Sequence, residues 1–156
     1  MLQTLMADGA QRRGFLLGGT ACAVATSVMV GVAWARRDRF AGEEMTPRAA
    51  LAAARSGDVL LVDIRRPDEW AQTGIPEGGH AIDLRRADFI EAVAALAEGD
   101  RTRRVALICA AGRRSDRTGA MLEDAGFEHV IDVPEGMAGS AAGPGWQARG
   151  LPVTWP

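Results

Sequence analysis

Short apolar runs alternate with amphipathic stretches from about residue 46 to residue 133. Residues 59–62 and 105–108 are continuously apolar, which is typical of strands buried on both faces of a parallel sheet. Between two such runs, apolar residues recur at helical spacing from Phe89 to Leu96, before Gly99. We therefore predict strands over residues 59–62, 80–84, 105–108 and 130–133, helices over 49–55, 89–96 and 118–125 with a short one beginning at 68, and a loop over 74–79.

This alternation of strands with helices of about ten residues predicts the fold class. Each strand–helix–strand unit is expected to be right-handed, which gives an α/β fold with a parallel sheet and helices on both faces. A chain of 156 residues has room for one such domain rather than two. In sheets of this kind, ligands bind beyond the carboxyl ends of the strands. The residues that directly follow strands are therefore the candidates for chemistry.

The first 35 residues differ from the rest of the chain. Residues 14–35 carry no charge and lie between Arg12-Arg13 and the charged run 36–39. A basic start, an apolar stretch and a final Ala33-Trp34-Ala35 are together typical of an export signal. The stretch also exceeds the ~18 residues that suffice to span a membrane. We therefore predict a signal or membrane anchor over residues 1–35, a linker over 36–42 and one domain over 43–156.

The signal resembles twin-arginine export signals, which a receptor reads and which export proteins already folded. Arg12-Arg13-Gly14-Phe15-Leu16 contains the intact core of that pattern, whereas Gln11 and Leu17 depart from it. This resemblance implies a periplasmic protein, or an inner-membrane protein whose domain faces the periplasm. Membrane contact is then expected only through residues 14–35, if these are not cleaved. The alternative is a plain anchor, for which the arginines after residue 35 would hold the domain in the cytoplasm.

Composition narrows the range of functions. The formal net charge is -2, so we expect no nucleic-acid partner. The two cysteines, Cys22 and Cys109, are too few for a disulfide framework or a four-cysteine metal site. Because His80 and His129 are the only histidines, we also expect no metal. We expect no cofactor either. Removal of residues 1–35 would leave Cys109 as a lone thiol, which indicates that it has a function of its own.

Cys109 opens the segment that carries the candidate chemistry. It follows the apolar run 105–108 and lies on the predicted strand-to-helix turn. Small residues there allow backbone N–H groups to curl into an anion-binding nest, and the helix N-terminus adds about half a positive charge. Both favour the thiolate, which is the nucleophilic form of cysteine. We predict Cys109 as the catalytic residue and, as the substrate-binding loop, Ala110, Ala111, Gly112, Arg113, Arg114 and Ser115.

The residues of this loop have distinct expected roles. Gly112 permits the backbone curl. Arg113 or Arg114 can bind an incoming oxyanion, and Arg113 can equally be a solvated surface residue. Ser115 can cap the helix or donate a hydrogen bond to the sulfur.

Asp63 and Arg65 are possible supporting residues, because they follow the strand predicted over 59–62. We expect their role to be mainly structural. Arg65 is four residues before Glu69, so we predict an ion pair between these two side chains.

The loop resembles that of rhodanese-like sulfurtransferases, which reads Cys-x-x-Gly-x-Arg-Ser. Residues 109–115 match every fixed position of that pattern. Residues 61–70 are similar to the family's Val-Asp-x-Arg-x-x-x-Glu-Trp stretch, and Gly74-Ile75-Pro76 to part of its following turn. The resemblance covers roughly residues 43–154. The turn lacks the family's histidine, and a Gly- and Ala-rich insertion over 138–145 is expected to alter the rim opposite the thiol.

The resemblance implies a sulfurtransferase. Its cysteine thiolate takes a sulfane sulfur from a small donor such as thiosulfate, becomes a persulfide, and passes the sulfur to a thiol, cyanide or a protein acceptor. One alternative is a non-catalytic rhodanese-like module that binds a partner or sulfide. A second is a cysteine phosphatase of related architecture, but its Cys-x5-Arg loop is one residue longer than the segment from Cys109 to Arg114. The shorter loop is expected to leave room for one extra sulfur atom on the cysteine rather than for a bound phosphate group.

Overall fold

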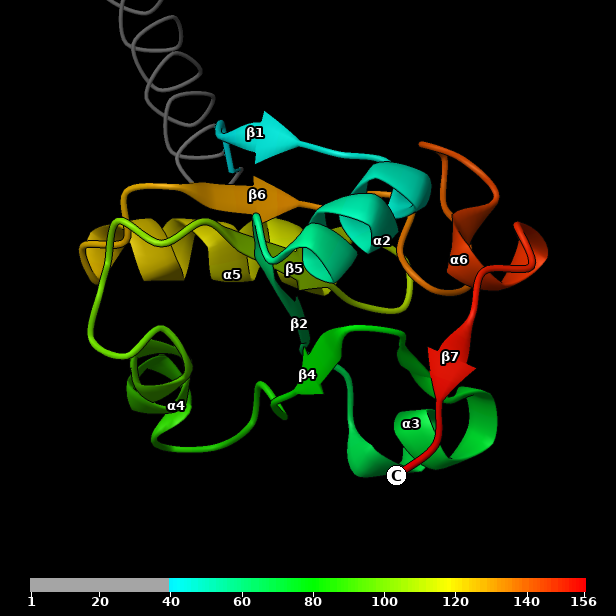
Figure 1. The fold of residues 1–156 in the computed structure, drawn as a ribbon, viewed down its shortest axis with the longest axis horizontal. Coiled ribbons are helices and arrows are strands. Elements are labelled where there is room, and N and C mark those ends of the chain that lie inside the picture. Colours follow the sequence, from blue (N-terminus) through cyan, green and yellow to red (C-terminus); the bar gives the residue numbers. More distant parts are fainter. Residues whose placement is uncertain (1–39) are drawn as a thin grey trace, which may run out of the picture. The chain divides into compact units, whose positions relative to one another are not determined.

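The computed structural model describes residues 40–156. Five strands form one sheet in the order β1-β6-β5-β2-β4, and all neighbouring pairs are parallel (Figure 1). The strands are β1 (Glu43–Glu44), β2 (Leu60–Asp63), β4 (Gly79–Ala81), β5 (Val105–Ile108) and β6 (Val130–Asp132), with β3 (Ile75–Pro76) and β7 (Val153–Thr154) in a separate antiparallel pair. The helices are α2 (Pro47–Ser56), α3 (Pro67–Thr73), α4 (Phe89–Leu96), α5 (Arg113–Asp124) and α6 (Gly145–Ala148). The predicted fold class is confirmed.

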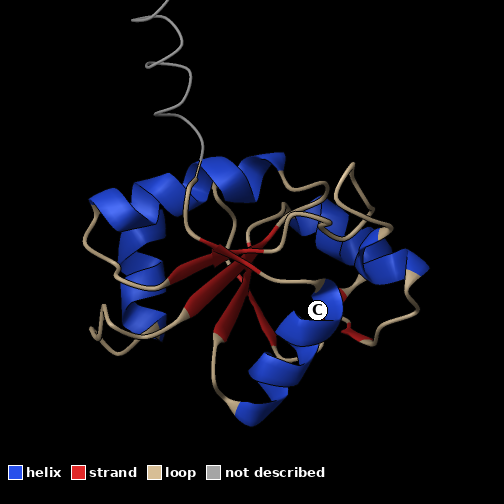
Figure 2. Ribbon diagram, turned by 90° about the horizontal axis from the view of Figure 1, so that it is seen from above, coloured by secondary structure: helices blue, strands red, loops and turns tan. Residues whose placement is uncertain are grey.

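Helices cover both faces of the five-stranded sheet (Figure 2). Because alternate residues of a strand point to opposite faces, each strand contributes to two cores. In β5, Leu107 packs with Phe89 of α4 and Leu122 of α5. Ala106, the preceding residue, packs on the other face with Leu51 of α2. Burial on both faces explains why the strand sequences are continuously apolar rather than alternating.

Capping residues set the ends of α2. The Thr46 hydroxyl accepts a hydrogen bond from the Ala49 N–H at 3.3 Å, and Pro47 occupies the first helical position. Gly57 ends the helix in the left-handed conformation, with φ of 77°. The helix therefore extends beyond the predicted range 49–55 at both ends.

The helix that follows Cys109 begins earlier than the sequence pattern predicts. It starts at Arg113 rather than at residue 118. The first turn is polar, so it lacks the apolar spacing that locates an amphipathic helix in a sequence. The earlier start brings the positive end of the helix dipole close to Cys109.

Several short elements depart from the predictions. β3 lies where a loop was predicted, and it pairs Ile75 with Thr154 of β7. β1, α6 and β7 have only two to four residues, which is too few to show a period. β4 ends at Ala81 rather than at residue 84, because the chain turns away after the Ile82 N–H has bonded to the Asp63 carbonyl.

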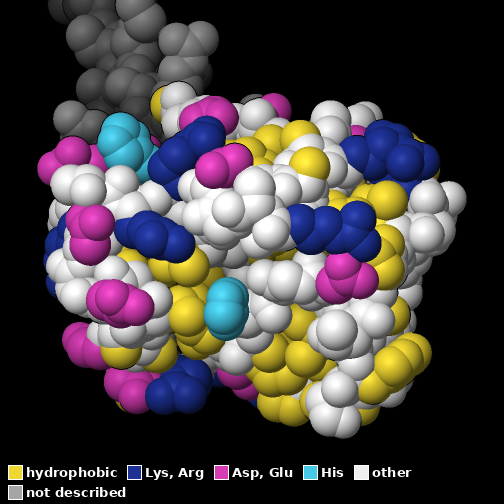
Figure 3. All heavy atoms as spheres, in the orientation of Figure 1, with side chains coloured by type: hydrophobic (Ala, Val, Ile, Leu, Met, Phe, Trp, Pro, Cys, Tyr) yellow, Lys and Arg dark blue, Asp and Glu magenta, His cyan; other side chains and the backbone are white. Residues whose placement is uncertain are grey.

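Charged side chains of both signs are interspersed on one face of the domain. On the face viewed in Figure 3, arginine side chains lie among aspartate and glutamate side chains rather than in one basic patch. Within residues 40–156, no helix has both the length and the apolar character needed to cross a membrane. The signal or anchor predicted over residues 1–35 lies outside the described residues, as does most of the linker predicted over 36–42.

Candidate active site

Cys109 lies at the carboxyl end of the central strand of the sheet. It directly follows Ile108, the last residue of β5, and α5 begins at Arg113 (Figure 1). Its thiol is free and its side chain is 1% exposed. The cysteine thus lies on a strand-to-helix turn at the edge where parallel sheets bind ligands, as the sequence predicts.

The loop after Cys109 leaves its backbone donors unpaired. In the described part of the chain, the N–H groups of residues 110–115 have no hydrogen-bond acceptor. Gly112, at the N-cap of α5, has φ of 79°, the left-handed conformation expected for the curl. Unpaired N–H groups and the positive end of the α5 dipole both favour an anion beside Cys109.

The segment that follows β6 holds this loop in place. The Met137 N–H donates to the Cys109 carbonyl at 2.9 Å, and the Ala138 N–H donates to the Ala110 carbonyl at 2.8 Å. A Cβ atom added at Gly112 would collide with the carbonyl oxygen of Pro134. The loop is therefore fixed by backbone contacts that leave no space for a larger residue at position 112.

The insertion over residues 138–145 is anchored by Glu135, which the sequence analysis did not single out. The buried Glu135 carboxylate accepts a hydrogen bond from the Gly145 N–H at 3.0 Å. It also forms an ion pair with Arg149 at 2.7 Å. The Ser140 hydroxyl donates to the Pro134 carbonyl at 2.7 Å. These contacts give the predicted rim a defined structure next to the loop.

Ser115 is fully buried in the first turn of α5, and its hydroxyl faces the sulfur. Its Oγ lies 3.6 Å from the Cys109 Sγ and 2.9 Å from the Gly112 carbonyl oxygen, and it can donate to either. Gly112, not Ser115, occupies the N-cap. Ser115 therefore does not cap the helix, and its hydroxyl lies within reach of the sulfur as well as of the Gly112 carbonyl.

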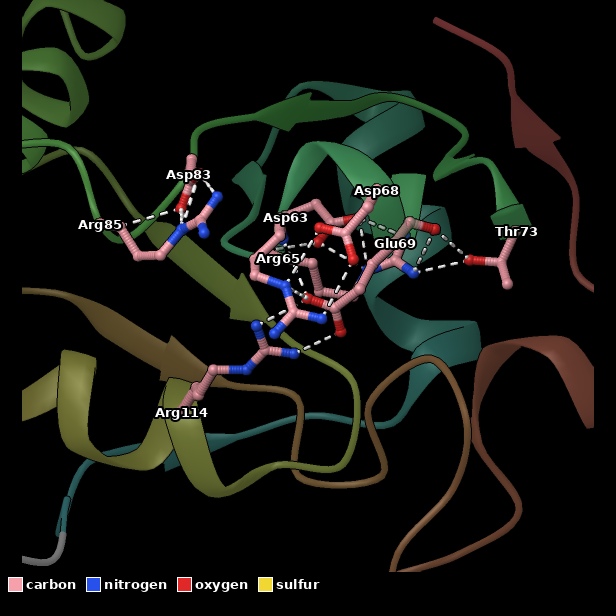
Figure 4. A network of polar contacts seen from close by, with 9 residues as sticks. Asp63, Arg65, Asp68, Glu69, Thr73, Asp83, Arg85 and Arg114 are labelled. Carbon is pink, nitrogen blue, oxygen red and sulfur yellow. Dashed lines mark hydrogen bonds and ion pairs between the residues drawn. The ribbon is translucent and has the colours of Figure 1, made fainter. Parts of the chain in front are cut away.

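Arg114 of α5 binds the Glu69 carboxylate of α3 (Figure 4). Its Nη1 and Nη2 donate to the two carboxylate oxygens at 2.8 Å and 2.6 Å. These hydrogen bonds lower the pKa of Glu69 to about 2. They also raise the pKa of Arg114, to which negative charge on Cys109 contributes further. Arg114 is thus the predicted arginine that lies beside the sulfur, whereas Arg113 is exposed.

Asp63 and Arg65 form a buried ion pair where β2 ends (Figure 4). Arg65 Nη2 lies 2.7 Å from Asp63 Oδ2, and Arg65 Nη1 donates to the Thr73 hydroxyl at 2.7 Å. The predicted side-chain pair between Arg65 and Glu69 is wrong. Arg65 precedes the start of α3 at Pro67, so the spacing rule for helices does not apply to it. Its structural role is that of a link between β2 and α3.

Asp132 also lies at this edge of the sheet, although the sequence analysis did not identify it. It is the last residue of β6 and is 5% exposed. Burial raises its pKa to about 6. A charged residue inside the apolar run 130–133 was the signal that could have identified it. Within residues 40–156, no three His, Cys, Asp or Glu side chains are arranged to hold a metal ion.

A family model establishes the relationship that this geometry suggests. The model of the rhodanese-like domain matches residues 46–142. The chain belongs to the rhodanese-like domain family. The matched segment of this rhodanese-like domain includes the whole loop from Cys109 to Ser115 and most of the insertion over 138–145.

Relatives and solved structures agree with this assignment. A sulfurtransferase from Allochromatium vinosum is 33% identical over 107 residues, which cover 66% of this chain and 85% of that protein. The polysulfide-sulfur transferase homodimer from Wolinella succinogenes has a TM-score of 0.58 at 23% identity, covering 88% of this chain and 93% of that chain. A thiosulfate sulfurtransferase from Pseudomonas aeruginosa has a TM-score of 0.55 at 25% identity, covering 73% of this chain and 20% of that chain. The two solved structures share the fold of this domain.

Replacement of Glu69 by glutamine is expected to destabilise this rhodanese-like domain at neutral pH but much less in acid. The folded-state pKa of about 2 lies below the value near 4.3 of an unfolded glutamate. The pair with Arg114 therefore contributes stability above pH 4.3, and that stability is lost as the pH falls toward 2. Because solvent reaches part of the pair, we expect a loss of about 1 kcal/mol at pH 7. The free energy of unfolding in urea, measured at pH 7 and pH 3 for the wild type and for Glu69→Gln, tests this prediction.

The matched control for this prediction is Asp68→Asn. Asp68 is the neighbouring residue of α3 and pairs on the surface with Arg66. Its replacement should change the stability little at either pH. An equal loss in both variants, or a Glu69→Gln effect of the same size at pH 7 and pH 3, would show that the Arg114 pair does not stabilise the loop.

Proposed function

We propose that this domain moves a sulfane sulfur from a donor such as thiosulfate, through a persulfide on Cys109, to a thiol, cyanide or a protein acceptor. The observation that carries the proposal is the setting of the sulfur at the N-terminus of α5. There the Ser115 hydroxyl lies 3.6 Å from the Cys109 Sγ and Arg114 lies beside it. The N–H groups of residues 110–115 have no acceptor among residues 40–156. Each of these groups favours negative charge on the sulfur.

The transfer takes place in two displacements. The Cys109 thiolate attacks the outer sulfur of thiosulfate, the S–S bond breaks, and sulfite leaves with the bonding electron pair. The product is a Cys109 persulfide, whose negative charge lies on the added sulfur atom. The acceptor nucleophile then attacks this atom, and the Cys109 thiolate leaves with the electrons of the second S–S bond.

Residues of this chain stabilise the anion in each step. The unpaired N–H groups of the loop and the positive end of α5 favour the added, charged sulfur of the persulfide. The Ser115 hydroxyl stabilises the Cys109 thiolate each time that it is the leaving group or the nucleophile. Arg114 contributes a fixed positive charge, which Glu69 holds in position.

The names of related proteins support this reaction class. The relative from Allochromatium vinosum is called a sulfurtransferase and is 33% identical. The structures from Wolinella succinogenes and Pseudomonas aeruginosa are a polysulfide-sulfur transferase and a thiosulfate sulfurtransferase. Polysulfide is therefore the second donor to compare with thiosulfate.

Steady-state kinetics of thiocyanate formation tests the proposal. With thiosulfate and cyanide varied together, a covalent intermediate gives parallel double-reciprocal lines, which is the ping-pong pattern. Lines that intersect would indicate direct transfer without a persulfide. No thiocyanate formation with either thiosulfate or polysulfide would favour the alternative, a non-catalytic module that binds a partner.

We also propose that residues 1–35 export the folded domain, with cleavage after Ala35 favoured over retention as an anchor. The support for this comes from the sequence alone, in the twin-arginine core of Arg12-Arg13-Gly14-Phe15-Leu16 and in Ala33-Trp34-Ala35. The domain would then act in the periplasm, either free or held at the inner membrane.

Replacing both Arg12 and Arg13 by lysine is expected to leave the full-length protein in the cytoplasm. The charge of the segment is unchanged, so only a receptor that recognises arginine itself would respond. Cell fractionation with immunodetection measures both the location and the size of the product. The control is Arg36→Lys with Arg37→Lys, which makes the same change outside the motif and should not affect export. Normal export of the Arg12→Lys, Arg13→Lys variant would instead indicate a plain anchor or a signal that depends on charge only.

A further inference from the structure

Phe40, which precedes β1 and lies in the segment predicted as a linker, contacts the helix that follows Cys109. Its backbone N–H donates to Asp116 Oδ1 in α5 at 3.1 Å. Its side chain is partly buried and packs against the core cluster that contains Cys109 and Leu122. The chain is therefore attached to α5 before it enters the sheet at β1, beside β6 (Figure 1).

Two glycines make room for the Phe40 ring. Gly119 lies in the second turn of α5, and a Cβ atom added there would collide with the ring. A Cβ atom added at Gly42, two residues after Phe40, would collide with the same ring. A glycine inside a helix costs stability relative to alanine, because it has more conformational freedom to lose on folding. The ring that occupies the space explains why α5 carries a glycine at position 119.

The first turn of α5 has no side-chain cap of its own. Gly112 is the N-cap residue and has no side chain to accept a hydrogen bond. The N–H groups of residues 113–115 have no acceptor in the described part of the chain. A cap would occupy the donors that the anion beside Cys109 needs. Because uncapped helix ends fray, contacts from outside the helix must hold this turn in place.

Contacts from two other parts of the chain hold the first two turns of α5. Arg114 pairs with Glu69 of α3 at 2.6 Å. Phe40 contacts Asp116 and Gly119, which are three residues apart and therefore lie on one face of the helix. Residues 114 and 116 point about 200° apart around a helix. The two contacts therefore hold α5 from nearly opposite sides.

We propose that Phe40 is a positioning residue that fixes the start of α5 and thereby sets the reactivity of Cys109. Its N–H and its ring hold one side of the helix, and the Arg114–Glu69 pair holds the other. The free N–H groups and the positive end of the helix dipole then stay directed at the sulfur. Without the Phe40 ring, the first turn frays and these groups stabilise the Cys109 thiolate less.

This inference rests on the proposed function only for its effect on sulfur transfer. Alkylation of Cys109 by iodoacetamide needs neither a sulfur donor nor an acceptor, and its rate reports the thiolate directly. A shifted alkylation profile in a protein that transfers no sulfur would support the role of Phe40 and contradict the proposed function. The two proposals can therefore fail separately.

The experiment measures alkylation of the Cys109 peptide from pH 5 to pH 9 in the full-length protein, for the wild type and Phe40→Ala. The midpoint of the rate profile should rise by about 0.5 pH unit in Phe40→Ala, the size of the effect of a helix terminus on a charge. The charged groups beside the sulfur, Arg114 and through it Glu69, are the same in both proteins. An unchanged alkylation midpoint in Phe40→Ala would overturn the proposal.

Ile90→Ala is the matched control for a general loss of packing. Ile90 is also partly buried and packs against the same core cluster, but it belongs to α4. The thermal unfolding midpoint should fall to a similar extent in Ile90→Ala and in Phe40→Ala, whereas the alkylation midpoint should shift only in Phe40→Ala. Equal shifts of the alkylation midpoint would show that Phe40 contributes packing alone.

Gly119→Ala tests the same contact from the helix side. In the wild type the added methyl group displaces the Phe40 ring, so the alkylation midpoint should rise as in Phe40→Ala and the thermal unfolding midpoint should fall by about 3 °C. In the Phe40→Ala background the space is empty. There the higher helix propensity of alanine should raise the thermal unfolding midpoint by about 3 °C. A change of the same sign in both backgrounds would overturn the proposal.

Discussion

Replacing Cys109 with serine is expected to abolish thiocyanate formation from thiosulfate and cyanide. The hydroxyl is nearly isosteric with the thiol, but it is a far weaker nucleophile near neutral pH and cannot form a persulfide. Loss of a catalytic nucleophile costs more than ~10³-fold in rate. The fold should persist, because the side chain is small and makes no disulfide. The measurements are the steady-state rate and the thermal unfolding midpoint.

Cys22→Ser is the matched control for this variant. Cys22 is the other cysteine of the chain, and it lies in the segment predicted to be a signal or anchor. Its replacement should leave the rate unchanged. If Cys109→Ser retains the wild-type rate while Cys22→Ser loses it, the catalytic thiol has been assigned to the wrong residue.

Gly112→Ala is expected to have the second largest effect. A left-handed conformation with φ of 79° costs an alanine about 1–2 kcal/mol. The added Cβ would also collide with the Pro134 carbonyl oxygen, in a segment held to the loop by hydrogen bonds from Met137 and Ala138. We expect a total loss of stability of about 2–4 kcal/mol. Displacement of the loop should reduce sulfur transfer by ~10²-fold, because catalytic groups tolerate little misplacement.

The Gly57→Ala variant distinguishes the effect of backbone strain from the effect of a steric collision of the added Cβ. Gly57 has almost the same φ, 77°, but no atom lies within 4 Å of an added Cβ. The stability of this variant should fall only by the strain of the left-handed conformation, about 1–2 kcal/mol, and its activity should not change. Similar losses of stability and activity in the two variants would show that the Pro134 contact does not shape the loop.

The sequence was sufficient to predict the loop because its residues are contiguous. Cys109, Gly112 and Ser115 lie between a strand and a helix, and backbone geometry alone brings them together. The partner of Arg114 could not be derived in this way. Glu69 is 45 residues away, on a different helix, and only the packing of α3 near α5 brings the two side chains together. The spacing of Arg65 and Glu69 predicted an ion pair, but α3 begins at Pro67 and Arg65 lies before the helix, so the spacing does not bring the two side chains together.

The elements of the fold that were not predicted are those whose sequences show no hydrophobic periodicity. β2, β5 and β6 are predicted within two residues of their observed ends, because their runs are apolar on both faces. β3 and β7 have two residues each, and the paired Ile75 and Thr154 are 79 residues apart in the sequence. Such strands depend on tertiary contacts rather than on local pattern.

Asp132 shows a different limit of sequence reasoning. A charged residue at the end of an apolar strand can be exposed as readily as buried, and the sequence does not decide between them. Its burial depends on β1 and α5, which cover it from two sides. The prediction for residues 1–35 rests on sequence motifs alone and remains a prediction.

Intact-mass spectrometry of the purified protein after incubation with thiosulfate is the most direct test of a Cys109 persulfide. The expected result is a mass gain of one sulfur atom, located on the peptide that contains Cys109 and removed by cyanide. The Cys109→Ser protein should show no gain under the same conditions. Unmodified Cys109 in wild-type protein that nevertheless forms thiocyanate, or a sulfur atom bound at another residue, would contradict it.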